Sequence, residues 1–92
     1  MLGIIINTKS GKKAYLRQRY YLFNLLKERG EDYTYRITRY AGHATELARE
    51  LAEKNGIRKF LILGGDGTIS ETINGLMAAK IPDRENLQFG IM

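Results

Sequence analysis

The chain lacks several residue types on which common functional sites depend. It contains no cysteine and no tryptophan, one histidine (His43) and one proline (Pro82). Without cysteine there is no disulfide, thiolate metal ligand or cysteine nucleophile, and one histidine excludes a histidine-rich zinc site. The sequence also has no apolar run of the roughly 20 residues that a membrane span needs, and its start does not resemble a secretory signal. We therefore expect a cytoplasmic location.

What the chain does contain is ordinary for a globular domain. Of its 92 residues, 43% are hydrophobic and 27% are charged, which argues against disorder. This length allows one small domain, so we assign residues 1–92 to a single unit. The sequence ends inside an apparent strand, without a following turn or polar tail. We therefore interpret the unit as part of a longer domain.

Acidic residues are missing from the first quarter of the chain. Residues 1–27 hold six basic residues and no acid, whereas residues 28–92 hold nine basic residues and ten acids. The basic segment is either a solvated helix face or a surface for an anion, such as a polyphosphate or an anionic membrane. We do not expect nucleic acid as a partner, because no recognition motif accompanies the charge. The candidate membrane contacts are Lys9, Lys12, Lys13, Arg17 and Arg19.

Hydrophobic periodicity predicts alternating strands and helices. Short apolar or alternating runs predict strands at residues 2–6, 33–37, 60–63 and 88–92, the second with one wetter face and near a sheet edge. Between them, apolar residues at three- and four-residue steps predict three helices. The stripes are Leu16, Tyr20, Phe23 and Leu26, then Ala44, Leu47, Ala48, Leu51 and Ala52, then Ile69, Ile73, Leu76 and Met77. The order β-α-β-α-β-α-β predicts an α/β fold, a three-layer open parallel sheet with helices on its faces.

A glycine-rich turn between the third strand and third helix is the strongest functional signal. Gly64-Gly65-Asp66-Gly67-Thr68 lies where a parallel sheet binds ligands, at the carboxyl ends of its strands. The glycines allow close approach and positive φ, and the free amides that open the helix suit a phosphate. Asp66 beside a phosphate favours a bridging Mg²⁺. Alternatively, Thr68 and Glu71 form a capping box that explains both by helix initiation alone.

Two further turns follow strands at the same predicted edge. Asn7-Thr8-Lys9-Ser10-Gly11 follows the first strand and offers hydroxyls, amides and a cation to a polyphosphate. Thr38 and the Gly42-His43-Ala44 segment follow the second strand, and His43 is also explained simply as a polar residue at a helix start. Each turn is a weak signal alone, but three polar turns on one edge favour a binding site.

The three turns together carry a resemblance to a known family. GGDGTISETINGL (residues 64–76) resembles the GGDGT-x-N-E-x-x-N-G stretch of the diacylglycerol kinase catalytic domain, which also occurs in sphingosine and ceramide kinases. NTKSG (residues 7–11) resembles the family's N-P-x-S-G turn, and residues 38–44 resemble its T-x-x-x-G-H-A stretch. Thr8 in place of proline and Ser70 in place of asparagine depart from the pattern.

The resemblance implies the N-terminal, ATP-binding lobe of a lipid kinase that transfers the γ-phosphoryl group of ATP, with Mg²⁺, to a lipid hydroxyl. The β-rich second lobe, with the catalytic base and the lipid site, is absent, so we expect no catalytic residue here and no activity from the 92 residues alone. The metal candidate is Asp66. The nucleotide-binding candidates are Asn7, Thr8, Lys9, Ser10, Gly11, Thr38, Gly64, Gly65, Asp66, Gly67, Thr68, Ile69, Ser70 and Glu71.

Two alternatives remain open at this point. An NAD kinase shares the GGDGT turn, and its N-terminal lobe has the same predicted fold. A non-catalytic nucleotide-binding or interaction module would also explain the turns. We further expect self-association through the C-terminal strand, because an uncovered strand edge pairs with another chain, and a location in the cytoplasm that extends to the inner membrane face.

Overall fold

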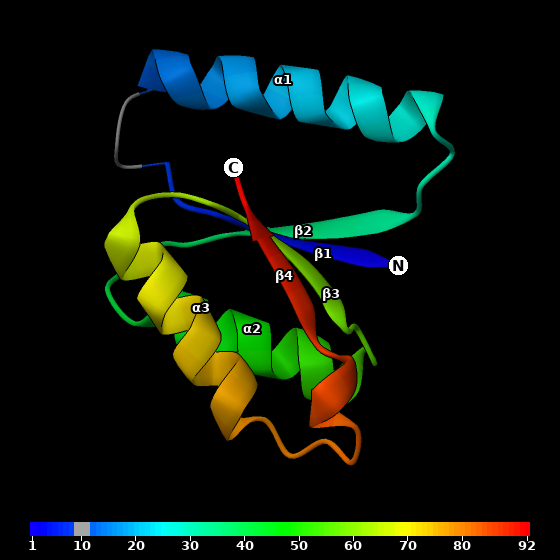
Figure 1. Ribbon diagram of the computed structural model, residues 1–92. Coiled ribbons are helices and arrows are strands. Elements are labelled where there is room, and N and C mark those ends of the chain that lie inside the picture. The colour runs from blue at the N-terminus through cyan, green and yellow to red at the C-terminus, as the bar shows by residue number, and fades with distance from the viewer. Residues whose placement is uncertain (9–11) are drawn as a thin grey trace.

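The computed structural model describes residues 1–8 and 12–92. Lys9, Ser10 and Gly11, three of the nucleotide-binding candidates, lie outside the described residues. The elements follow the predicted order, with one short 3₁₀ turn added before the last strand (Figure 1). They are β1 (Leu2–Ile6), α1 (Lys12–Glu28), β2 (Tyr33–Ile37), α2 (His43–Lys54), β3 (Lys59–Leu63), α3 (Asp66–Ala78), η1 (Arg84–Asn86) and β4 (Gln88–Ile91).

The four strands form one parallel sheet in the order β2-β1-β3-β4. This confirms the predicted fold class, and it confirms that β2 lies at an edge. Strand β4 is hydrogen-bonded to β3, so the sheet is four-stranded, and Phe89 and Ile91 remain 46% and 58% exposed at the other edge. Self-association through this edge stays a prediction.

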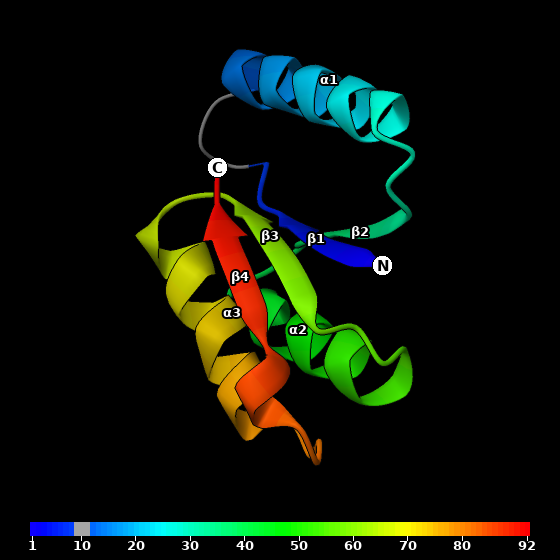
Figure 2. The same ribbon diagram turned by 45° about the vertical axis from the view of Figure 1, so that its right-hand side comes forward.

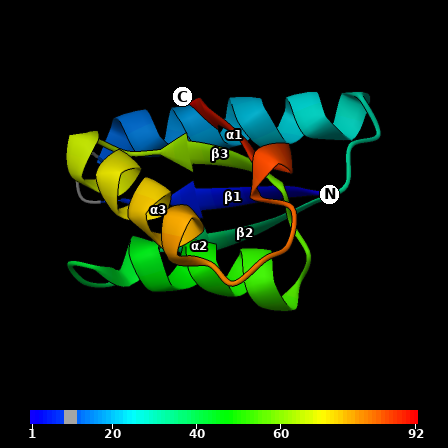
Figure 3. The same ribbon diagram turned by 60° about the horizontal axis from the view of Figure 1, so that its bottom comes forward.

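The sheet separates two helical layers (Figures 2 and 3). Helices α2 and α3 cover one face, where Ile5, Phe60 and Leu51 belong to a cluster of nearly inaccessible side chains. Helix α1 covers the opposite face, where Ile4, Ile6 and Leu63 pack against Leu22 and Leu26. The continuous apolar runs of β1 and β3 follow from this arrangement, because both of their faces are covered.

The predicted stripe of α2 is confirmed, since Ala44, Ala48, Leu51 and Ala52 are all buried. In α1, Leu26 is buried, but Tyr20 is 75% exposed, so its assignment to the inward stripe was wrong. Tyr20 lies at the margin of the buried stripe because Leu22 and Leu26 set the direction that faces the sheet.

The buried stripe of α3 also differs from the prediction. It consists of Thr68, Thr72, Gly75 and Leu76, whereas Met77 is 49% exposed. Threonine is tolerated there because the hydroxyl of Thr72 donates to the carbonyl oxygen of Thr68 at 2.8 Å. Gly75 is required because a Cβ atom at this position would lie 2.3 Å from the carbonyl oxygen of Thr45. A small polar stripe, rather than an isoleucine stripe, lets α3 approach α2 closely.

Candidate functional site

The described parts of the three predicted turns meet at the carboxyl edge of the sheet, where β1, β2 and β3 end. The backbone amide of Asn7 donates to the carbonyl oxygen of Leu63 at 2.8 Å, and that of Thr38 donates to Ile6 at 2.8 Å. These bonds extend the ladder by one residue beyond each strand. Asn7 and Thr38 are therefore held in fixed positions beside the turn that follows Leu63.

A small cavity of about 180 Å³ lies between the three turns. Its wall is made by residues that follow β1 and β2 and by residues from the first turns of α3, namely Asn7, Thr38, Tyr40, Ala41, Gly67, Thr68 and Glu71. Five of these are among the predicted site residues. The structure thus brings together residues that are up to 64 positions apart, from Asn7 to Glu71.

The glycine turn is shorter than the sequence predicts. Helix α3 begins at Asp66 with Gly65 as its N-cap residue, so Thr68 lies inside the helix and does not cap it. The capping-box interpretation of Thr68 and Glu71 was therefore wrong. The hydroxyl of Thr68 instead accepts a hydrogen bond from the Asn7 side-chain amide at 2.9 Å, which joins α3 to the end of β1.

None of the glycines in the turn has a positive φ, so that part of the prediction was wrong as well. Gly64 has a packing role, because a Cβ atom there would lie 2.8 Å from the side chain of Thr68. Gly65 and Gly67 differ, since apart from adjacent residues and the backbone of α3 itself, no described atom lies within 4 Å of the position that their Cβ would occupy. These two exposed glycines leave the backbone at the start of α3 open to a ligand.

The first backbone amides of α3 point to anion binding. The first hydrogen bond of the helix runs from the Ile69 amide to the Gly65 carbonyl oxygen at 3.1 Å. The backbone amides of Asp66, Gly67 and Thr68 therefore take no part in the hydrogen bonds of the helix. None of the three donates a hydrogen bond within residues 1–8 and 12–92. Such amides, together with the positive end of the helix dipole, favour a phosphate.

The other candidates differ in how they relate to this cavity. Thr8 is half-buried and follows Asn7, whereas Ser70 is exposed on α3 outside the cavity wall. The Ile69 amide is already used by the helix. Asp66 is exposed in the first turn of α3, and no group of three or more acidic or histidine side chains gathers in the described part of the chain. A single carboxylate still fits Mg²⁺ in one respect, since that ion is typically held by one or two carboxylates together with phosphate oxygens.

Sequence reasoning missed two residues of the cavity wall, Tyr40 and Ala41. Both lie inside the T-x-x-x-G-H-A stretch, between Thr38 and Gly42, at positions where that pattern allows any residue. Tyr40 donates a hydrogen bond to the Glu46 carboxylate. This bond, with smaller contributions from burial and from the negative charge of Glu46, raises the pKa of Tyr40 above its ordinary value.

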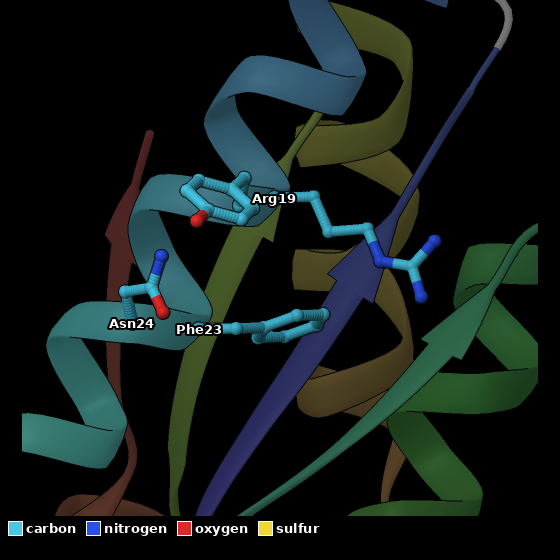
Figure 4. A pocket seen from close by; sticks show the side chains of 4 residues that line it. Arg19, Phe23 and Asn24 are labelled. Atoms are coloured by element: carbon cyan, nitrogen blue, oxygen red, sulfur yellow. The ribbon is translucent and has the colours of Figure 1, made fainter.

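The structure describes only some side chains of the basic segment. Arg17 is exposed, while the side chains of Lys12 and Lys13 and all of Lys9 lie outside what the structure describes. Arg19 makes cation–π contacts within the chain, because its guanidinium lies 5.6 Å from the ring centre of Phe23 and 5.9 Å from that of Tyr35. Figure 4 shows Arg19 and Phe23 extending from α1 on the side of the strands, next to a hollow of about 350 Å³. None of the described helices is long and apolar enough to cross a membrane.

The chain is similar to known proteins along its length. The profile of the diacylglycerol kinase catalytic domain matches residues 1–92. A diacylglycerol kinase of Bacillus subtilis is 34% identical over 87 residues, which are 91% of this chain and 27% of that protein. A YegS-like candidate lipid kinase of Chromohalobacter salexigens is 37% identical over 74 residues, covering 80% of this chain and 22% of the relative.

The fold is also found in a solved structure. A crystal structure of a candidate diacylglycerol kinase from Bacillus anthracis superposes with a TM-score of 0.78 at 26% sequence identity. The match covers 98% of this chain and 29% of the other. The chain thus spans about a quarter of the length of the curated relatives it matches.

Proposed function

The chain belongs to the diacylglycerol kinase catalytic domain family, and from this premise we propose that it is the ATP-binding part of a lipid kinase. The proposed reaction transfers the γ-phosphoryl group of ATP to a lipid hydroxyl. The observation that carries the proposal is the start of α3, where three amides without described partners stand beside two exposed glycines. The named relatives are lipid and diacylglycerol kinases, which favours this reading over an NAD kinase.

The proposed role of this site is to position a polyphosphate and neutralise its charge. Phosphoryl transfer depends on such positioning more than on covalent chemistry by the protein. The amides of Asp66, Gly67 and Thr68 would donate to phosphate oxygens, and Asn7 and Thr38 would complete the polar wall. Mg²⁺, when bound, supplies charge neutralisation between phosphate oxygens, and Asp66 is the carboxylate that we assign to it.

The hydrogen bond between Asn7 and Thr68 preorganises this arrangement. It fixes the first turn of α3 against the end of β1 before any ligand arrives. A preorganised set of donors costs less ordering on binding than a flexible one. The lipid acceptor, the catalytic base and the anionic membrane contact of the basic segment are proposals for the whole protein, which in the relatives is about four times as long as the matched part.

Titration of the 92-residue chain with ATP and Mg²⁺, followed by amide chemical shifts, tests the proposal. We expect a dissociation constant above about 100 μM, because the small cavity leaves much of a nucleotide in water. The shifts should centre on residues 64–68, and Asp66→Ala should weaken the dependence of binding on Mg²⁺. Saturable shifts that leave residues 64–68 unaffected would contradict the assignment.

A further inference from the structure

Tyr40 is the aromatic residue in the wall of the site cavity, and the phosphate-binding turn does not explain it. It lies between β2 and α2 and faces the same cavity as Gly67 and Thr68 of α3. About half of its surface, 51%, is accessible to solvent. A large aromatic side chain that is neither in a core nor fully solvated, and that borders a polar cavity, is suited to contact a ligand.

The Tyr40 ring is held in place by its neighbours. The ring of His43 stacks on it with centroids 4.3 Å apart and planes inclined by 12°. The phenol hydroxyl donates to Glu46, and the Nδ1 atom of His43 accepts a hydrogen bond from the Arg39 backbone amide at 3.0 Å. These contacts occupy one face of the Tyr40 ring and fix its orientation.

We propose that Tyr40 is a nucleotide-binding residue whose second ring face stacks on the base of the bound nucleotide. This inference rests on the proposed function, and it divides the ligand between two parts of one site. The amides at the start of α3 take the phosphates, and Tyr40 takes the base. The cavity of about 180 Å³ is smaller than pockets that enclose a whole drug-sized ligand, so much of the nucleotide lies outside it and only its walls contact the base and the phosphates.

Charge decides which part lies against Tyr40. The carboxylate of Glu46 accepts a hydrogen bond from the Tyr40 hydroxyl. This negative charge repels a phosphate beside Tyr40, whereas an uncharged planar base is not repelled. The first amides of α3, which have no partner among the described residues, and the positive helix end lie across the cavity, at Gly67 and Thr68. The polarity of the cavity therefore orients the nucleotide.

The test compares two ligands that share phosphates and differ in the base. ATP with Mg²⁺ and inorganic tripolyphosphate with Mg²⁺ are titrated into the wild-type chain and into Tyr40→Ala, with amide shifts as the readout. We expect about tenfold weaker binding of ATP by Tyr40→Ala and unchanged binding of tripolyphosphate, because base–aromatic stacking contributes to only one of them. GTP should behave like ATP, since every base offers a π face.

Two control variants separate the ring from other effects. Tyr40→Phe keeps the ring and loses the hydroxyl bond to Glu46, so it should bind ATP within about twofold of wild type. Tyr21→Ala removes a tyrosine that is 62% exposed on α1, away from the cavity, and should change neither ligand. In the wild-type complex, the adenine protons should shift upfield through the ring current of Tyr40 and lose that shift in Tyr40→Ala.

The outcomes distinguish this inference from the function on which it rests. If ATP binds at residues 64–68 equally well in wild type and Tyr40→Ala, the base lies elsewhere and the stacking role is overturned while the nucleotide site stands. If Tyr40→Ala weakens both ligands equally, Tyr40 supports the phosphate site and does not read the base. If neither ligand binds wild type, the proposed function fails and the stacking role fails with it.

Discussion

The two faces of the sheet are covered in different ways. One face is covered by α2 and α3 (Figure 3). There, Ala44, Ala48 and Ala52 of α2 are fully buried, and Gly75 lets α3 cross close to Thr45. On the other face, α1 leaves Tyr33 and Tyr35 of β2 37% and 40% exposed, although Phe23 contacts both rings. One face is packed through small residues and backbone, and the other through long side chains.

This difference indicates which helices determine the positions of the site residues. Two of its three turns lead directly into α2 and α3, the helices of the closely packed face. A fixed crossing of these helices fixes the distance between Tyr40 and Gly67 across the cavity. Close packing of an interior transmits small displacements instead of absorbing them. We therefore expect changes in the α2–α3 contact to disturb the site more than changes under α1.

The strongest test of this comparison is Gly75→Ala. The added Cβ would lie 2.3 Å from the Thr45 carbonyl oxygen, which is backbone and cannot rotate away. We expect the free energy of unfolding to fall by about 3 kcal/mol, with the nucleotide shifts lost as the helices separate. Urea unfolding measures the effect.

Gly65→Ala is the matched control for stability, because the space around its Cβ position is open. An unchanged urea midpoint for Gly75→Ala would refute the close crossing of α2 and α3.

A second test compares one leucine from each face. Leu51 in α2 is 1% exposed, and Leu22 in α1 is 5% exposed. Leu51→Ala should cost about 3–4 kcal/mol, within the usual range for a cavity in a core that cannot collapse. Leu22→Ala should cost about 2 kcal/mol, because α1 can settle toward the sheet. Equal losses in thermal or urea unfolding would show that the two faces are packed equally well.

The sequence predicted the strand order along the chain, the strand bounds to within about a residue and the three turns of the site. It succeeded there because apolar runs and glycine turns are local signals. It misjudged α3, because burial of Thr68 and Thr72 depends on a helix crossing that no local pattern reveals. It missed Tyr40 for the same reason, since the cavity exists only once β2 and α3 are brought together.

The hydrogen bond between Asn7 and Thr68 allows a finer test, because it connects the end of β1 to α3. Thr68→Val keeps the shape of the side chain and removes the acceptor at a position that is 4% exposed. We expect a loss of about 1 kcal/mol in unfolding free energy, the usual net value of such a bond. Thr34→Val is the control, because that hydroxyl accepts a hydrogen bond from Arg36 within the edge strand β2 and does not connect β1 to α3. A loss at Thr34 as large as at Thr68 would remove the special role of the β1–α3 connection.

The smallest expected effect lies at the opposite end of the closely packed face, away from the site. Arg58, directly before β3, pairs with Asp83 at 2.9 Å and also donates to the carbonyl oxygens of Ala52 and Ile57. The hydrogen bond from Arg58, followed by that from Asn86, lowers the pKa of Asp83 below its ordinary value of 3.8. The pair thereby joins the end of α2 to the segment before β4.

The sign of the pH dependence follows from that lowered pKa. A carboxylate whose pKa is lower in the folded state stabilises the fold above its unfolded pKa, and this contribution disappears as the pH falls through the folded value. Asp83→Asn should therefore be slightly less stable than wild type near pH 7, and the difference should close below about pH 4. Because the pair is partly exposed, added salt should also reduce the difference. Glu85→Gln, in the 3₁₀ turn that follows Asp83, is the control because it removes an equal charge and leaves the Arg58–Asp83 pair in place. Urea unfolding at several pH values measures the stability of both variants. An identical pH profile for the two would show that net charge, and not the ion pair, causes the effect.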